Sequence, residues 1–462
     1  MNYSRRTPLC PLRLHLMTND IRIKKLLLCC LASLSFISVL SAQAPDLTSG
    51  GVPSDTLIFN LGPTGGTGWW YRSNGNTAES RQILVTVVDA GSPADGILEV
   101  DDVILGADGT GASPVAFSSD ARKSLGKAIA DAEARNMAGN LKLLLWRAGT
   151  TSEVSVSLPF LGAYSATAPY NCPKSAAIFE LGLDYVMKNL STESDADAGT
   201  FSFRSLALLA ANGLQYDGGT GGGGDAARQA QAASEVRSLI LDEAKIAEYK
   251  SGAVSGESKI SWSAGHQLIV LSEYYLQTGD ATVLPSIEAW AVLIANGASV
   301  FGTMGHQLAQ PATVPWSDGS TNGSYTVGYG VVNSAAVPCY LGLSIAKKCN
   351  LTGLTAAQSA KVDATLENMS RYYGYHEGWG SIMYGENAPF SFYADNGKSG
   401  AAALGLALDS DRASESKYFA KSAAISFNAR ESGHTGSYFN MLWSPLGAAV
   451  GGEEIADRKS VV

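Results

Sequence analysis

Thr86–Gly109 reads TVVDAGSPADGILEVDDVILGADG and decides the fold of the N-terminal third of the chain. An alternating apolar run that ends at Val88 predicts a strand. The turn residues Gly91–Gly96 follow, and a second apolar run, Val103–Leu105, stops at Asp108 and a glycine. Glycine, proline and aspartate at these points are typical of turns between strands. We therefore predict two strands joined by a compact turn.

This stretch resembles the centre of a bacterial PDZ domain, through Gly91-Ser92-Pro93-Ala94-Asp95-Gly96, Leu98 and Asp102–Leu105. The resemblance implies a small PDZ-like α+β domain at Thr56–Phe160. One position departs from the pattern, because PDZ domains usually have Gly-Asp where this chain has Asp101-Asp102. Aspartate tolerates left-handed backbone geometry better than most residues, so we expect the fold to be kept.

The PDZ resemblance also implies a peptide groove. In that family a Gly-rich loop, here within Asn60–Gly68, offers backbone N–H groups to the C-terminal carboxylate of a peptide, which then adds a strand to the sheet. The groove would be bordered by a helix over Ser119–Arg135, with Ser118 or Ser119 as its N-cap. The implied partner is a peptide, a protein C-terminus or an extended segment. The implied ligand-binding residues are Gly65, Gly66, Thr67, Gly68, Trp69, Leu125 and Ile129. The alternative is that the loop is only a turn and the domain binds no ligand.

Residue spacing supports the rest of this domain. Leu125, Ala128, Ile129 and Ala132 recur at helical spacing and predict the apolar face of the helix. Leu141–Arg147 and Ser152–Leu158 alternate as strands around Ala148-Gly149-Thr150, which predicts a hairpin.

The first 44 residues are typical of an export signal. Arg22, Lys24 and Lys25 precede the fifteen-residue apolar run Leu26–Leu40, and small residues end at Ala44. The run is shorter than the ~20 residues that span a bilayer, so we expect cleavage, a periplasmic or extracellular location and no stable membrane span afterwards. Retention as an anchor is the alternative. The formal net charge is −9, and because residues 1–44 hold six basic and one acidic residue, the remainder carries about −14. That balance argues against nucleic acid as a partner.

Cofactor and disulfide signals are absent from the sequence. Beyond the signal only Cys172, Cys339 and Cys349 remain, without close pairs, and buried thiols are the expectation. No CxxC or HExxH spacing occurs, so we predict no metal and no cofactor.

A Pro-containing segment, residues 161–174, predicts a linker to a helical domain at 175–456. Ten apolar-periodic segments alternate between more charged and fully apolar character, which favours outer and inner helices. The segments are Ala176–Asn189, Phe203–Ala211, Ala226–Ala247, Ser263–Gln277, Thr282–Asn296, Asn333–Cys349, Thr355–Tyr373, Gly400–Asp409, Ser416–Arg430 and Thr435–Gly447.

Five outer–inner pairs predict an all-α α/α toroid, incomplete at its C-terminus, with an open α-solenoid as the alternative. Tyr274–Asp280 resembles the aromatic-then-Thr-Gly-Asp turn common between toroid helices. Residues 457–462 are interpreted as a non-native tail, so the native chain is expected to continue beyond about Ala456 with other residues in their place. Together with Leu161–Tyr164 and Ala168–Ser175, this organisation resembles an uncharacterised family of exported bacterial proteins that fuse a PDZ domain to a toroid.

Candidate chemistry lies in the helical region. Its histidines, His266, His306, His376 and His434, fall at or near loops, and His266 and His434 each follow a glycine and open a predicted inner helix. The densest polar-aromatic cluster comprises Tyr375, His376, Glu377, Trp379, Tyr384, Glu386 and Tyr393. Such a mixture suits carbohydrate recognition and acid–base catalysis of glycoside cleavage. The candidate catalytic residues are His376, Glu377, His266 and His434, with Tyr375 and Trp379 as ligand-binding residues. Capping and packing are the structural alternative for each.

Three functions stay open from the sequence. The first is an exported envelope protein with a PDZ-like module for peptide or protein-segment binding and a toroid of unknown activity. The second is a carbohydrate-active hydrolase or lyase with its site at the toroid mouth. The third is a non-catalytic structural component of the envelope.

Overall fold

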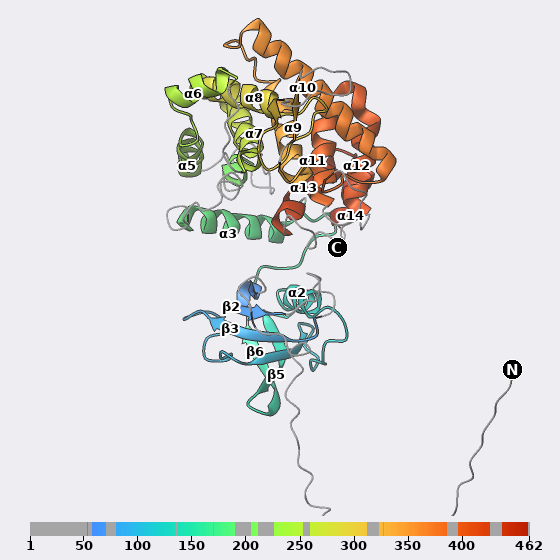
Figure 1. Ribbon diagram of the computed structural model, residues 1–462. Helices are drawn as coiled ribbons and strands as arrows, with labels where there is room; N and C mark the ends of the chain where they lie inside the picture. Colours follow the sequence, from blue (N-terminus) through green and yellow to red (C-terminus); the bar gives the residue numbers. More distant parts are fainter. Residues whose placement is uncertain are drawn as a thin grey trace, which may run out of the picture.

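A computed structural model describes residues 53, 58–70, 80–134, 137–169, 171–189, 205–210, 226–252, 259–311, 323–326, 328–385, 396–425 and 437–460. They form a small antiparallel-sheet region followed by a mostly helical region (Figure 1). The predicted export signal lies outside the described residues. No helix among the described residues is long and apolar enough to cross a membrane.

The sheet region contains six antiparallel strands in the order β1-β2-β3-β4-β5-β6. The elements are β1 (Ile58–Asn60), the 3-10 turn η2 (Gly62–Thr64), β2 (Gly66–Trp69), β3 (Ile83–Val88), β4 (Val103–Asp108), α2 (Ala121–Ala132), β5 (Asn140–Arg147) and β6 (Thr150–Ser157). Leu125, Ala128 and Ala132 of α2 are buried against the apolar side of the sheet, as their spacing predicted. Arg147 pairs with Thr150 across the two-residue turn, which confirms the predicted hairpin.

One local prediction for the sheet region is wrong and another is confirmed. The expected N-cap at Ser118 or Ser119 is wrong, because the Asp120 side chain caps α2 by accepting from the N–H groups of Arg122 at 3.0 Å and Lys123 at 3.4 Å. A carboxylate at this position also interacts favourably with the helix dipole. Asp101 has a φ of 74°, so the left-handed geometry expected where PDZ domains have glycine is confirmed.

The segment between the two regions folds back onto the end of α2. The Gly162 N–H donates to the Glu133 carbonyl at 3.1 Å. Lys174, in the first turn of α3 (Pro173–Asn189), forms an ion pair with Glu133, and the two side chains are 1% and 4% exposed. The Lys174 Nζ also lies 4.5 Å from the centroid of the Tyr164 ring. This buried ion pair joins the helical region to the sheet region.

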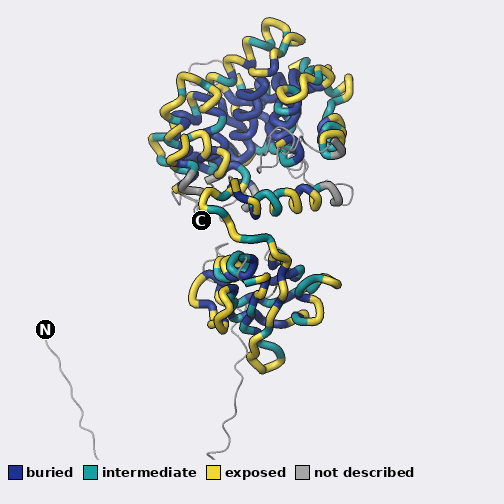
Figure 2. Tube along the Cα trace, turned by 180° about the vertical axis from the view of Figure 1, so that it is seen from behind, coloured by how far each residue is buried: buried dark blue, intermediate teal, exposed yellow. Residues whose placement is uncertain are grey.

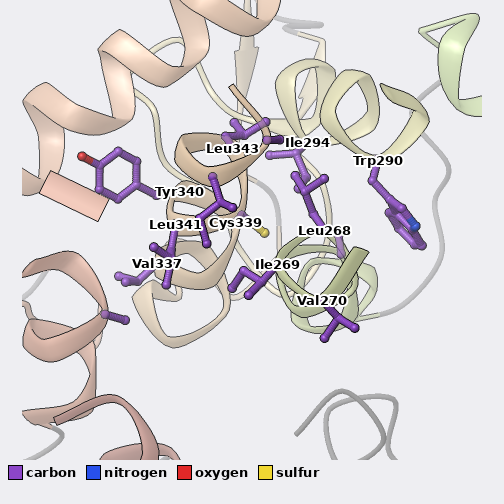
Figure 3. Close-up of a cluster of buried hydrophobic side chains, with 14 of the residues drawn as sticks. Leu268, Ile269, Val270, Trp290, Ile294, Val337, Cys339, Tyr340, Leu341 and Leu343 are labelled. Carbon is purple, nitrogen blue, oxygen red and sulfur yellow. The ribbon is translucent and has the colours of Figure 1, made fainter. Parts of the chain in front are cut away.

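The helical region is built around four neighbouring helices, α7 (Ile260–Thr278), α9 (Asn333–Ala346), α11 (Asn396–Ala407) and α13 (Ser437–Ala449), which pack consecutively against one another. Around them lie α5 (Ala226–Arg237), α6 (Glu243–Lys250), α8 (Leu284–Gly297), α10 (Ala356–Tyr375), α12 (Ala413–Ile425) and α14 (Glu453–Ser460). Residues 205–210 are also helical. Burial is concentrated in the centre of this region (Figure 2). Figure 3 shows Leu268 of α7, Ile294 of α8 and Cys339 of α9 in one apolar cluster.

Two expectations for these helices are wrong. The segment predicted as one helix over Ala226–Ala247 divides into α5 and α6, because Asp242 caps α6 by accepting from the Lys245 N–H at 2.8 Å. The segment Thr282–Asn296 was predicted as a more charged outer helix, but most residues of α8 from Ser286 onward are buried. It is buried because α6 and α10 pack on it in addition to α7 and α9.

Glycines set the spacing of the four central helices. A Cβ on Gly265 of α7 would lie 2.4 Å from backbone atoms of Pro338 and Cys339 in α9, and a Cβ on Gly400 of α11 would lie 2.2 Å from the Trp443 carbonyl oxygen in α13. Between α9 and α11, by contrast, the nearest neighbour of Gly405 is the Tyr340 ring. A hollow of about 290 Å³ opens beside this ring, near the C-terminal ends of α9 and α11. The helices therefore form two tight backbone pairs with a side-chain seam between them.

The predicted Thr-Gly-Asp turn after α7 is confirmed. Gly279 ends the helix with a φ of 70°, and Asp280 accepts from the Thr282 N–H at 3.0 Å and from the Tyr274 hydroxyl at 2.9 Å. The hydrogen bonds from Thr282 and Tyr274 hold the pKa of Asp280 well below its usual value. Cys172, Cys339 and Cys349 are free and buried, as expected. Burial raises the pKa of the Cys339 thiol to about 12.

Candidate functional site

The Gly-rich loop of the sheet region folds into the turn η2 and uses its own amides. The Gly62 N–H donates to Asn60 Oδ1 at 2.7 Å, the Gly65 N–H to the Gly62 carbonyl at 3.3 Å, and the Gly66 N–H to Thr64 Oγ1 at 3.2 Å. Three amides that could hold a carboxylate therefore already have acceptors. Capture of a peptide C-terminus at these amides would require the three hydrogen bonds to break. Binding of an internal extended segment would not, because such a segment has no terminal carboxylate to place there.

Both edges of β2 are hydrogen-bonded in this structure. On one side β1 pairs with it in the register Ile58 with Trp69 and Asn60 with Thr67, and on the other side it pairs with β3. The predicted ligand residues Thr67, Gly68 and Trp69 therefore lie inside the sheet, and Trp69 is 1% exposed. β1 therefore occupies the edge of β2 at which the PDZ resemblance implies that a ligand strand would add.

The two helix residues predicted to line the groove lie in different environments. Leu125 is buried in the core beneath the sheet, whereas Ile129 is half-buried and lies close to Gly62 of η2. A second hollow of about 290 Å³ lies beside α2, lined by Asp108, Phe117 and Lys127 among others, and is therefore on the β4 side of the helix. Of the two predicted helix residues, only Ile129 lies where a strand beside β2 would contact it.

The candidate histidines of the helical region are packed inward. His266 Nδ1 is hydrogen-bonded to the Trp262 carbonyl at 2.9 Å, and His376 Nδ1 to the Tyr372 carbonyl at 2.8 Å. Each imidazole is therefore held against the backbone carbonyl of the residue four positions earlier. Their exposures are 3% and 2%. Burial lowers the pKa of both rings, because the charged form loses its hydration. His434 lies outside the described residues.

The remaining members of the predicted catalytic cluster do not share this interior. Glu377 follows His376 in the 3-10 turn η6 (His376–Trp379) and is half-buried, whereas Tyr375 is 72% exposed and Trp379 is 43% exposed. Glu386 and Tyr393 lie outside the described residues. Within the described ranges, no group of three or more His, Cys, Asp or Glu residues could hold a metal ion.

Sequence reasoning named His306 and Tyr384 as candidates but did not group them with Trp262 and Tyr329, which the structure brings together. Trp262, His306, Tyr329 and Tyr384 come from three separate segments and contact one another in that order. We name these four residues the aromatic strip. Their common signal is position, because Trp262 lies in the first turn of α7 and the others lie in the segments that lead into α9 and α11.

Comparison with known proteins places the helical region in a family. A family model described as "Domain of unknown function (DUF6288)" matches residues 175–459, which is more than half of the chain. The chain belongs to this family. Searches of the curated proteins and of the solved structures gave no match. The DUF6288 region begins within the first turn of α3, directly after Lys174.

Proposed function

We propose that the sheet region is a PDZ-like module that binds an extended segment of another protein, and that β1 occupies the place of that segment until it is displaced. The observation that carries the proposal is the antiparallel pairing of β1 with β2, at the edge where a PDZ ligand would add. The paired stretch is three residues long, and β1 is an edge strand. A short edge strand is the least costly strand of a sheet to exchange.

Phe59 is the main side-chain anchor of β1. Its ring stacks on the Trp70 ring with centroids 5.2 Å apart and an interplanar angle of 11°. Ile58 and Phe59 are both half-buried, and Asn60 is exposed. The ligand that fits this place is therefore an extended segment with an aromatic or large aliphatic residue in its centre, since backbone pairing gives affinity and the side-chain contact gives specificity.

The helical region, in this proposal, is an α/α toroid that carries the module. Support comes from the four consecutive central helices and the surrounding outer helices, which is the arrangement that a toroid or an open solenoid would share. Export to the periplasm or the cell exterior is part of the same proposal and is supported by the signal-like sequence before residue 45. Acid–base catalysis at His266 or His376 gains no support, because both rings are buried in packed helix contacts.

The test uses a fluorescein-labelled peptide with the sequence of residues 55–61 and the full chain. The tethered β1 competes with the peptide, so weakening β1 must raise peptide affinity. Loss of the Phe59–Trp70 stack weakens β1 by ~0.5–1.5 kcal/mol. The Phe59→Ala variant is therefore expected to bind the peptide about two- to twelvefold more tightly than the wild type, measured by fluorescence anisotropy.

Phe160→Ala is the matched control, because Phe160 is 52% exposed and lies outside the sheet. It is expected to bind the peptide as the wild type does. Equal binding by the wild type and the Phe59→Ala variant, or no binding by either, would show that β1 is an ordinary hairpin strand and not a displaceable one.

A further inference from the structure

The aromatic strip lies at one end of the central helices and is held there by hydrogen bonds between loops. The Val332 N–H donates to the Met304 carbonyl at 2.9 Å, and the Asn333 N–H donates to the Tyr384 carbonyl at 2.8 Å. Asn333 Nδ2 also donates to the Met383 carbonyl at 2.9 Å. The loops that carry His306 and Tyr384 are therefore fixed to the start of α9, and Tyr329 lies four residues before Asn333, where α9 begins. Fixed rings keep their relative orientation before a ligand arrives, which lowers the entropy lost on binding.

Trp262 and His306 form the inner end of the strip. Their rings stack at 5.8 Å with an interplanar angle of 24°, and Trp262 Nε1 donates to His306 Nδ1 at 2.8 Å. An indole N–H is only a donor, so Nδ1 must accept and the imidazole proton is placed on Nε2. The Ser261 hydroxyl donates to the His306 carbonyl at 2.6 Å and holds the backbone behind the ring. His306 is therefore fixed in ring position and in tautomer.

The outer end of the strip is open to solvent. Tyr329 is 69% exposed and its ring lies 5.4 Å from that of His306 and 6.3 Å from that of Tyr384. The Tyr329 ring is tilted by 58° to the His306 ring and lies at 85° to the Tyr384 ring, which is an edge-to-face contact. Lys398, in the first turn of α11, places its Nζ 6.0 Å from the Tyr384 ring centroid. An exposed large aromatic on a rigid, half-buried aromatic base is unusual for packing alone and is typical of a binding surface.

We propose that the aromatic strip binds a carbohydrate chain. Sugar rings have apolar C–H faces that pack on aromatic faces and hydroxyl edges that need polar partners, and this strip alternates ring faces with Tyr hydroxyls and an imidazole N–H. Nucleic acid also stacks on aromatic rings, but it requires a basic groove, and the chain carries a net charge of −9. A proline-rich peptide is the remaining ligand that docks on aromatic grooves, and the test separates it from sugar. The site does not depend on the sheet region or on displacement of β1.

The experiment measures retention of the full chain on insoluble cellulose, chitin, xylan and peptidoglycan, and binding to an octaproline peptide by calorimetry. At least one polysaccharide is expected to retain the wild type. Tyr329→Ala is expected to weaken that retention at least tenfold, because it removes the exposed ring while leaving the half-buried base in place. Trp262→Phe keeps an aromatic face but removes the donor that fixes His306, so a smaller loss of about threefold is expected.

Tyr185→Ala is the matched control, since Tyr185 is 64% exposed and lies on α3 outside the strip. It should bind as the wild type does. Retention on none of the four polysaccharides overturns the proposal, as does equal loss in the Tyr329→Ala and Tyr185→Ala variants. Binding of octaproline without retention on any polysaccharide assigns the strip to a peptide and overturns the carbohydrate assignment.

Discussion

The buried ion pair between Lys174 and Glu133 allows a quantitative test of the junction between the two regions. Replacing Lys174 with methionine leaves the Glu133 carboxylate, 4% exposed, without its partner. Removing one member of a buried pair usually costs ~3–5 kcal/mol, because the remaining charge stays desolvated. The double variant Lys174→Met/Glu133→Leu removes both charges, and we expect it to lie within ~1 kcal/mol of the wild type for the same reason.

Native-state hydrogen exchange of the full chain, read on peptides from α2, measures this effect locally. A loss of 3–5 kcal/mol corresponds to exchange about two to four orders of magnitude faster in the Lys174→Met variant. Lys127→Met is the control on the same helix, because Lys127 pairs with Asp131 while 74% exposed, and such pairs contribute ~0–1 kcal/mol. Equal protection in the two single variants, or a double variant as labile as Lys174→Met, would refute the reasoning.

Three further predictions concern stability. Burial lowers the pKa of His376 and His266, so the unfolded chain binds more protons than the folded chain below pH ~6.5. The free energy of unfolding should therefore decrease as the pH is lowered below that value, by up to ~1.4 kcal/mol per pH unit for each histidine. Urea titrations should show a smaller decrease in the His376→Phe variant. Gly265→Ala should destabilise the helical region by ~1–3 kcal/mol, because its Cβ would clash with the backbone of α9. Gly126→Ala should stabilise α2 by up to ~1 kcal/mol, because its Cβ would meet nothing within 4 Å. Calorimetric melting distinguishes the two signs. Asp101→Gly should stabilise the sheet region by ~0.5 kcal/mol and raise its melting temperature slightly, because relief of left-handed backbone strain exceeds the cost of the greater entropy of the unfolded chain. A lower melting temperature would contradict this.

Much of the sheet region could be predicted from local sequence. The alternation of Leu141–Arg147 and the turn at Ala148 are short-range signals, and the structure confirms the hairpin they predict. The left-handed Asp101 was also accessible, because backbone preference is local. The position of β1 was not accessible, since pairing with β2 is a choice between neighbours in space.

The helical region was predictable in outline but not in its layers. Apolar periodicity located α7 and α9 correctly, because each is long and strongly buried. It failed for α8, whose burial depends on α6 and α10 packing over it. No local pattern records which other helices will cover a given face.

The candidate site illustrates the same limit. The position of a histidine near a loop gave no information on the direction of its side chain, and His266 and His376 are both buried in packed interiors. His306 lies on the aromatic strip, but only the tertiary fold brings its loop next to Trp262 of α7 and to Tyr329, which precedes α9. Contacts that assemble from distant segments are set by the tertiary fold and not by spacing along the chain.

The two tight helix pairs have a mechanical consequence. Backbone-to-backbone contact at Gly265 and Gly400 makes each pair stiff, so elastic deformation of the helical region should concentrate at the seam where Gly405 meets the Tyr340 ring. That seam is pinned at one end by the Asn333 hydrogen bonds and hollow at the other. Thermal bending should therefore separate α9 from α11 at the hollow end of the seam, while the hydrogen-bonded end keeps its spacing.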